Sequence, residues 1–95
     1  MLDVRRIKSS ALRQFARGNQ RRINPQWRPR MRRILFALNA AAHPSDLNVP
    51  GYDFHELKGD RKGTYAVKVT GNWRVTFKWD DNGPFAVDLE DYHGK

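Results

Sequence analysis

The chain is predicted to fold as a small α+β domain, with two N-terminal helices packed on one face of a small twisted antiparallel sheet. Two observations predict this class. Apolar residues follow the 3.6-residue period of a helix in the first half of the chain, and beyond Gly63 they alternate with a period of two. The length of 95 residues suits one hydrophobic core, so residues 1–95 are expected to form a single domain.

The N-terminal segment is expected to form a short edge strand followed by a helix. Scattered apolar residues favour the strand from Leu2 to Ile7. Ser9 or Ser10 offers a side-chain oxygen that can cap a helix running through Arg17. The glycine that follows, Gly18, supplies the left-handed conformation that ends such a helix.

A second helix is predicted after Asn24-Pro25, which have the character of a cap and a first helical residue. Because Pro29 removes one backbone hydrogen bond, regular helix is expected to begin near Arg28. The helix should end before Pro44, since the residue before a proline avoids helical angles. Its apolar positions are Trp27, Met31, Ile34, Leu35, Leu38 and Ala42.

Residues 45–63 are rich in Pro, Gly, Asp and Asn, which predicts a connection with one brief strand from Phe54 to Leu57. A connection of this length favours a functional role.

Three antiparallel strands are predicted to follow as a meander, because apolar residues alternate with polar or small ones. A two-residue turn at Gly71-Asn72 would pair Val69 with Arg74 and put a charge on the apolar face. A three-residue loop from Thr70 to Asn72 is therefore predicted. The apolar set is Tyr65, Val67, Val69, Trp73, Val75, Phe77, Trp79, Phe85, Val87 and Leu89.

The helices are expected to cover the apolar face and to leave a polar face open. Four side chains should point from this open face: Lys68, Arg74, Thr76 and Lys78. Regular alternation adds Tyr92 to them and puts Asp91 and His93 on the other face. The last strand must therefore bend if His93 is to lie beside Arg74.

The net charge of +8 and the pI near 10.5 are unevenly distributed along the chain. Residues 1–33 hold ten Arg and one Lys against Asp3 alone, whereas residues 80–95 hold five acidic residues against Lys95. Because a guanidinium can bind a phosphate through two donors, the basic block predicts a polyanion partner. A membrane surface and an acidic protein are the weaker alternatives, and for any single Arg a solvated surface is the better interpretation.

The composition also narrows the class of protein. There is no cysteine, so disulfides and thiolate metal sites are ruled out and the cytoplasm is the expected compartment. The first residues open no apolar signal region, and no run of about 18 apolar residues predicts a membrane span. The spacing of His43, His55 and His93 does not favour a zinc site, and no cofactor is expected.

Four motifs occur in order: His55-Glu56-Leu57-Lys58-Gly59-Asp60-Arg61, Tyr65-Ala66-Val67, Gly71-Asn72-Trp73-Arg74-Val75-Thr76-Phe77 and Glu90-Asp91-Tyr92-His93. Their order and spacing resemble the HigB group of toxins, within the RelE and ParE toxin superfamily. The resemblance is close from about Phe54 to His93. In the first half of the chain it extends only to a layout of two helices of similar length. It implies a RelE-like fold and a bacterial toxin that cleaves mRNA in the A site of a translating ribosome. It also implies an antitoxin with a helix-turn-helix module, through which alone the pair would bind operator DNA.

Metal-independent RNA cleavage needs groups that move a proton from the 2'-hydroxyl, protonate the leaving 5'-oxygen and stabilise the phosphoryl charge. His93 is the predicted acid or base, because an imidazole has an ordinary pKa of about 6.5. Arg74 is predicted to bind the phosphate, and Tyr92 to stack on or orient a base. Asp91 is predicted to steer the imidazole or take the hydroxyl proton, and the resemblance adds His55 and Lys58 as further site members. Which of His55, Asp91 and His93 is the base stays open.

RNA binding is predicted for seven cationic residues: Lys58, Arg61, Lys68, Arg28, Arg30, Arg32 and Arg33. On composition alone, each is as well explained as a solvated cation. Two other functions stay open, a non-catalytic RNA- or ribosome-binding protein and a superfamily toxin that acts on DNA gyrase. The gyrase reading ranks last, because that branch does not generally combine the terminal Asp-Tyr-His with the central Arg.

Overall fold

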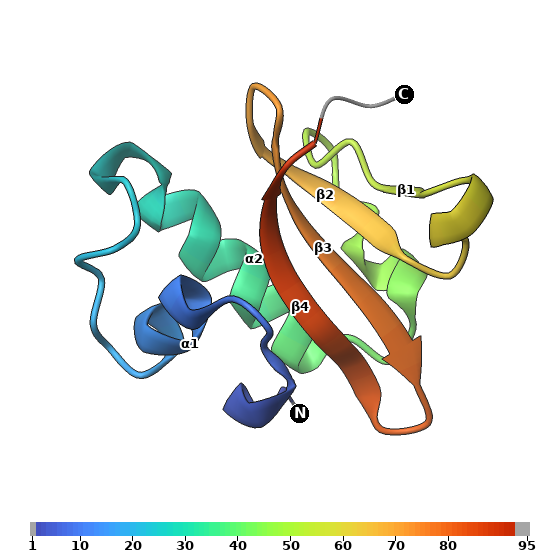
Figure 1. Ribbon diagram of the computed structural model, residues 1–95, viewed down its shortest axis with the longest axis horizontal. Coiled ribbons are helices and arrows are strands. Elements are labelled where there is room, and N and C mark those ends of the chain that lie inside the picture. The colour runs from blue at the N-terminus through green and yellow to red at the C-terminus, as the bar shows by residue number, and fades with distance from the viewer. Residues whose placement is uncertain (1, 93–95) are drawn as a thin grey trace.

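The structure is a computed structural model that describes residues 2–92, in which four strands form one antiparallel sheet (Figure 1). The strand order is β1-β2-β3-β4, so each strand pairs with its neighbour in sequence. Together with two helices, this sheet confirms the α+β prediction. The strands are β1 (His55–Glu56), β2 (Tyr65–Thr70), β3 (Trp73–Asp80) and β4 (Gly83–Asp91).

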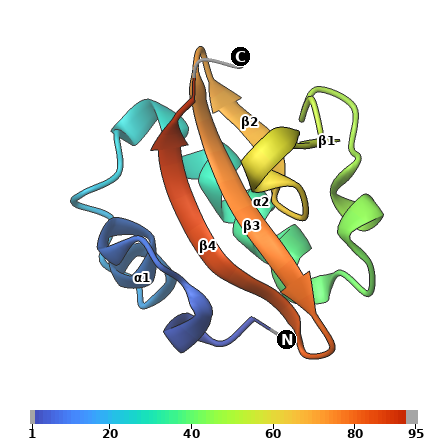
Figure 2. The same cartoon turned by 45° about the vertical axis from the view of Figure 1, so that its right-hand side comes forward.

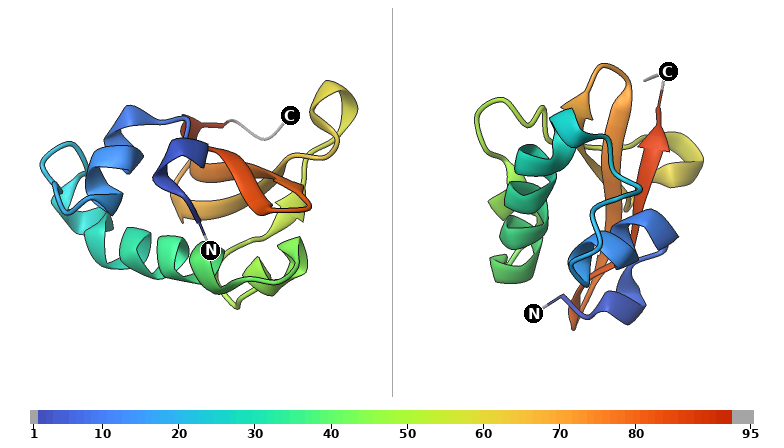
Figure 3. Two further views of the ribbon diagram at one scale, coloured as in Figure 1. Left: turned by 90° about the horizontal axis from the view of Figure 1, so that it is seen from below. Right: turned by 90° about the vertical axis from the view of Figure 1, so that its left-hand side faces the viewer.

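Helix α1 (Ser10–Ala16) begins where the sequence predicted, because the Ser9 hydroxyl accepts a hydrogen bond of 3.2 Å from the Leu12 N–H. Gly18 follows the helix with φ of +100°. In two views at right angles, α1 lies beside the β4 edge of the sheet (Figures 1 and 3).

Helix α2 (Arg28–Ala40) covers one face of the sheet (Figure 3) and begins at the predicted residue. The preceding 3-10 turn η2 (Pro25–Trp27) is capped by Asn24, whose side chain accepts from the Gln26 N–H. The prediction that Ala42 continues the apolar face of this helix is wrong. Ala41 is already extended, so Ala42 lies beyond the helix and is exposed.

The N-terminal segment is not the predicted edge strand. It forms a 3-10 turn, η1 (Val4–Arg6), because the Asp3 carboxylate accepts from the Arg5 N–H at 2.9 Å and caps it. Only Ile7 retains strand character, in an isolated parallel bridge to Val87.

The 45–63 connection carries two further 3-10 turns, η3 (Pro44–Leu47) and η4 (Gly59–Arg61). Figure 2 shows η4 and β1 at the opposite edge of the sheet from α1. The brief strand predicted here is confirmed as β1.

The core lies between the sheet and the helices. Phe77 is fully buried at its centre, with ring centroids of Tyr65 and Trp79 at 5.7 and 6.3 Å. Trp27 on η2 packs against Trp73 at 5.4 Å, which confirms that these aromatic residues belong to the core. The other buried members are Ile7, Leu12, Phe15, Ile23, Met31, Ile34, Leu38, Leu47, Tyr52, Val67, Val69, Val75 and Val87.

The β2–β3 turn differs from the predicted three-residue loop. Thr70 pairs with Trp73, which leaves only Gly71 and Asn72 in the turn. The register shifts between Lys68 and Thr70, so a bulge at Val69 keeps that side chain in the core. The apolar side chains of β2 and β3 lie on one face, as expected. The bulge at Val69 brings about this match, and no longer loop is needed.

A second irregularity lies in β4, where Ala86 has a φ of +50° and the register with β3 shifts. Phe85 consequently lies opposite Lys78, and Pro84 is buried opposite Trp79. The prediction that Phe85 shares the core face with Val87 and Leu89 is therefore wrong. The Phe85 ring instead lies 5.4 Å from the guanidinium carbon of Arg6.

No helix within residues 2–92 is long and apolar enough to cross a membrane.

Candidate active site

The face of the sheet opposite α2 carries a polar hollow of about 400 Å³, which we call the open-face hollow. Its floor is formed by β3 and β4, and one wall is formed by η4. Its lining includes both cationic and anionic side chains. The lining residues are Lys8, Asp60, Arg61, Thr64, Thr76, Lys78, Ala86, Asp88 and Glu90.

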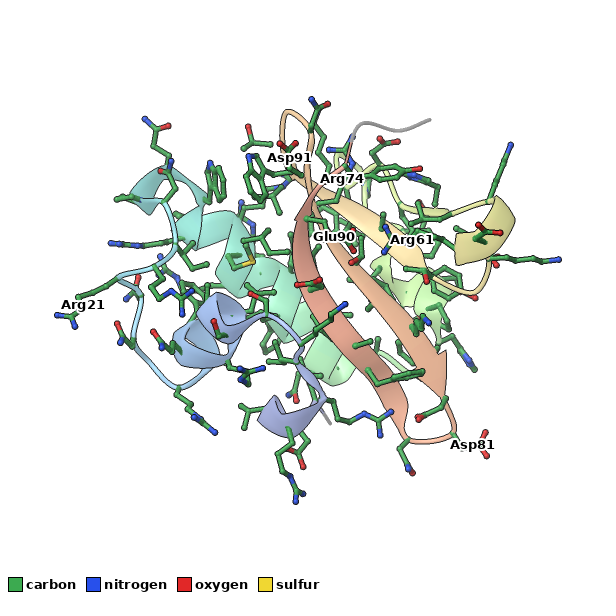
Figure 4. All side chains as sticks on the ribbon, viewed as in Figure 1. Arg21, Arg61, Arg74, Asp81, Glu90 and Asp91 are labelled. Carbon is green, nitrogen blue, oxygen red and sulfur yellow. The ribbon has the colours of Figure 1, made fainter. Side chains whose placement is uncertain are left out.

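Arg61 and Glu90 form a two-point ion pair across this hollow (Figure 4). The Nη1–Oε1 and Nη2–Oε2 distances are 2.8 and 2.7 Å. The buried Thr76 hydroxyl donates a hydrogen bond to the same carboxylate. Glu90 therefore holds the guanidinium of Arg61 over the sheet, in the paired geometry that strengthens such contacts.

The pKa of Glu90 is lowered from its usual range, mainly by the hydrogen bonds from Arg61 and further by Thr76. In turn, the Arg61 pKa is raised, first by the Glu90 hydrogen bonds and to a lesser extent by Tyr92 and Asp88. Tyr92 thus lies within the electrostatic reach of Arg61.

Replacing Glu90 by glutamine is expected to lower the free energy of unfolding at neutral pH by about 1 kcal/mol, since the ion pair is lost. Because the folded-state pKa of Glu90 is lowered, its contribution is present above pH 4.5, the ordinary glutamate value, and is lost as pH falls through the folded-state value. Urea unfolding of both proteins at several pH values should therefore show the difference shrinking in acid.

The matched control is Asp81→Asn, at an exposed turn between β3 and β4 (Figure 4). It should leave the pH dependence of unfolding close to that of the wild type. A stability difference for Glu90→Gln that stayed constant into acid would contradict the assigned role of the ion pair.

Arg74 on β3 lies directly opposite Lys68 on one side and Glu90 on the other. Its guanidinium turns toward the β2–β3 turn, where Nη1 donates to the carbonyls of Gly71 and Trp73 at 2.6 and 3.2 Å. Only 13% of the side chain is exposed. Its Nε is buried and has no hydrogen-bond partner among residues 2–92.

Asp53 connects two of the predicted site residues. Its carboxylate lies 3.7 Å from the Nη2 of Arg74, and its backbone carbonyl lies 2.9 Å from the Nδ1 of His55. The backbone of Asp53 has a φ of +49°, a conformation that aspartate adopts more readily than most residues. The sequence predictions missed Asp53 and Glu90 as site members, although both lie in or beside segments that they singled out.

Strand register brings several predicted residues to the open face. His55 lies opposite Ala66, which lies opposite Thr76, and that row ends at Asp88. Lys68, Arg74 and Glu90 form the adjacent row.

The remaining predicted site residues lie at the start of η4 and at the end of β4. Lys58 is exposed at the start of η4. Asp91 is exposed and lies opposite Trp73, as alternation predicted, and the Tyr92 N–H donates to the Asn72 carbonyl at 2.8 Å. His93, the predicted acid or base, lies outside the described residues.

The α2 arginines belong to the helix that covers the other face of the sheet (Figure 3), and none of them lines the open-face hollow. Arg28 donates to the Ile23 carbonyl at 3.0 Å, and Arg32 donates to the Gln20 side chain at 3.1 Å. Arg33 is exposed.

Arg30 is the most engaged of these arginines. It donates to the carbonyls of Lys68 and Gly51, and its guanidinium carbon lies 5.0 Å from the Tyr52 ring centroid. Arg30 therefore links the loop before β1 to strand β2. The sequence predicted only RNA binding for this residue, and not this structural role.

Within residues 2–92, no group of three or more His, Asp or Glu side chains is arranged to hold a metal ion.

Comparison with known proteins identifies the family. The family model described as the RelE-like toxin of the type II toxin-antitoxin system HigB matches residues 5–93. The chain belongs to the HigB-like toxin family. This membership confirms the resemblance inferred from the four motifs, and it implies an antitoxin as the partner of this toxin.

Two relatives of this HigB-like toxin show how far the similarity extends. Endoribonuclease HigB of Proteus vulgaris is 34% identical over 79 residues, which cover 83% of this chain and 86% of the relative. Toxin HigB-1 of Vibrio cholerae is 40% identical over 50 residues, covering 52% of this chain and 53% of that protein.

Proposed function

We propose that this HigB-like toxin is an endoribonuclease that cleaves mRNA in the A site of the translating ribosome and so arrests translation and growth. The observation that carries the proposal is the two-row arrangement of His55, Lys68, Arg74 and Glu90 on one open face. Family membership and the name of the Proteus vulgaris relative support the same activity.

The proposed reaction is metal-independent. The 2'-hydroxyl attacks the adjacent phosphorus in line as it loses its proton, and the 5'-oxygen leaves as it gains one. His93 is proposed to make one of these transfers, and either Asp91 or His55 the other. Tyr92 is proposed to stack on or orient the base beside the scissile phosphate.

Arg74 is proposed to stabilise the charge that develops on the phosphoryl oxygens. Its place on the open face, in one row with Lys68 and Glu90, supports this role. Its Nη1 contacts with Gly71 and Trp73 would hold the guanidinium in place before the substrate arrives.

Three cations around the open face, Lys58, Arg61 and Lys68, are proposed to bind the mRNA backbone. Arg61 is paired with Glu90 in the free protein, so a phosphate must share or replace that carboxylate. The arginines of α2 are proposed to contact ribosomal RNA, with Arg32 and Arg33 the most exposed of the four.

The partners proposed beyond the family's antitoxin are the ribosome and mRNA, which make the cytoplasm the site of action. The antitoxin is proposed to carry a helix-turn-helix module, through which the pair would bind operator DNA.

The test is to map cleavage of a reporter message in a translation extract, with and without ribosomes, using the wild type and His93→Ala. We expect cuts only when ribosomes translate the message, and we expect the variant to lose them. Salt-sensitive RNA binding without any cleaved product would favour a non-catalytic RNA-binding protein. Inhibition of DNA supercoiling with an intact message would favour a gyrase poison.

A further inference from the structure

A single aromatic side chain stands out on the helical layer. Phe36, on α2, is 73% exposed, whereas the other exposed large apolar residue of the described chain, Val49, is 37% exposed. An exposed side chain of this size next to an apolar hollow is typical of an interaction site.

Phe36 forms one wall of a hollow of about 320 Å³ between α2 and the N-terminal segment, which we call the Phe36 hollow. Most of its lining is apolar. None of its residues lines the open-face hollow. The lining residues are Leu2, Val4, Ile7, Phe15, Ala16, Arg32, Leu35, Phe36 and Asn39.

The charge around the Phe36 hollow is positive. Arg32 is the charged residue that lines it, and Arg33 lies exposed one helical turn from Phe36. Helices α1 and α2 contain no acidic residue, and the sequence holds none between Asp3 and Asp46. A partner that fits this surface must therefore combine apolar side chains with negative charge.

We propose that the Phe36 hollow binds an acidic amphipathic segment of the antitoxin. Apolar side chains of that segment would fill the hollow against Phe36 and Leu35, and its carboxylates would pair with Arg32. A second copy of this toxin would bring its own basic helices against these, which like charges oppose. RNA offers phosphates for Arg32 but lacks the aliphatic side chains that an apolar hollow binds best.

The test is to measure binding of Phe36→Asp to the antitoxin encoded beside this toxin, by titration calorimetry. We expect the Kd to rise about tenfold or more, because an exposed aromatic at the centre of an interface carries much of the binding energy. The antitoxin should then fail to rescue growth from the variant, which should remain toxic alone. Val49→Asp is the matched control and should bind like the wild type.

Two further variants show whether weaker binding comes from loss of the ring, from the added charge or from unfolding. Phe36→Ala removes the aromatic ring without adding a charge and should also weaken binding, while its thermal unfolding stays close to wild type. Arg32→Glu should weaken binding most at low salt.

Three results would overturn the proposal. One is a Kd for the antitoxin that stays within about twofold of wild type for both Phe36 variants. The expected rise is about tenfold, which corresponds to about 1.4 kcal/mol. Another is a toxin dimer, seen by light scattering, that Phe36→Asp dissociates. The last is loss of ribosome binding with antitoxin binding intact, which would assign the surface to RNA.

Discussion

Replacing Arg74 by alanine is expected to lower the rate of mRNA cleavage by about a hundredfold to a thousandfold, because a donor aimed at the developing phosphoryl charge is lost. Arg74→Lys should recover little of this rate, since an ammonium cannot reproduce the planar fork that now spans Gly71, Trp73 and Asp53. Single-turnover cleavage of a ribosome-bound message measures both effects.

Two comparison variants test whether the effect of Arg74→Ala comes from its place in the site or only from the loss of a positive charge. Arg21→Ala removes an exposed arginine on the loop between α1 and η2, well to the left of Arg74 in Figure 4, and should leave the cleavage rate nearly unchanged. Asp53→Asn keeps both backbone contacts of Arg74 and should cost much less than Arg74→Ala. Full cleavage by Arg74→Ala would exclude this residue from the reaction.

Replacing Phe77 by alanine is expected to lower the free energy of unfolding by about 3–5 kcal/mol, because a fully buried aromatic leaves a cavity. The loss includes ring contacts with Tyr65 and Trp79. For a domain whose total stability is of the order of 5–15 kcal/mol, much of the protein would unfold near physiological temperature. Urea unfolding followed by tryptophan fluorescence measures the change.

The same substitution at an exposed site is the control for Phe77. Phe36→Ala removes an identical ring from the surface and should change the free energy of unfolding by less than about 0.5 kcal/mol. If the two variants were equally stable, the core would not be centred on Phe77.

The sequence predicted the strands well because alternation is a local property of the chain. Trp73, Val75 and Phe77 had to share one face whatever the neighbouring strands did. The start of α2 was also predictable, since Asn24 and Pro25 act on the backbone next to them.

The irregular positions depended on contacts that the sequence does not display. The bulges at Val69 and Ala86 depend on how each strand meets its neighbour, and the second one moved Phe85 out of the core. The first turn of the chain depended on one capping contact of Asp3.

The same limit applies to the candidate site. The family resemblance implied a site that contains both Arg74 and His55, and register places these two residues in adjacent rows of one face. The link through Asp53 was not predictable, because it requires a left-handed residue to turn its carbonyl toward His55 and its carboxylate toward Arg74.

The ends of the sheet have a consequence for how the free toxin behaves in concentrated solution. Strand β1 spans only two residues, and the outer side of β4 receives hydrogen bonds at the Val87 carbonyl from the backbones of Lys8 and Ser9, at 2.6 and 3.2 Å. The short β1, and the irregularity at Ala86 together with the Val87 contacts on β4, each interrupt an edge to which another chain could pair. Interrupted edges of this kind oppose growth into fibrils, which favours a dispersed toxin once it is released from its inhibitor.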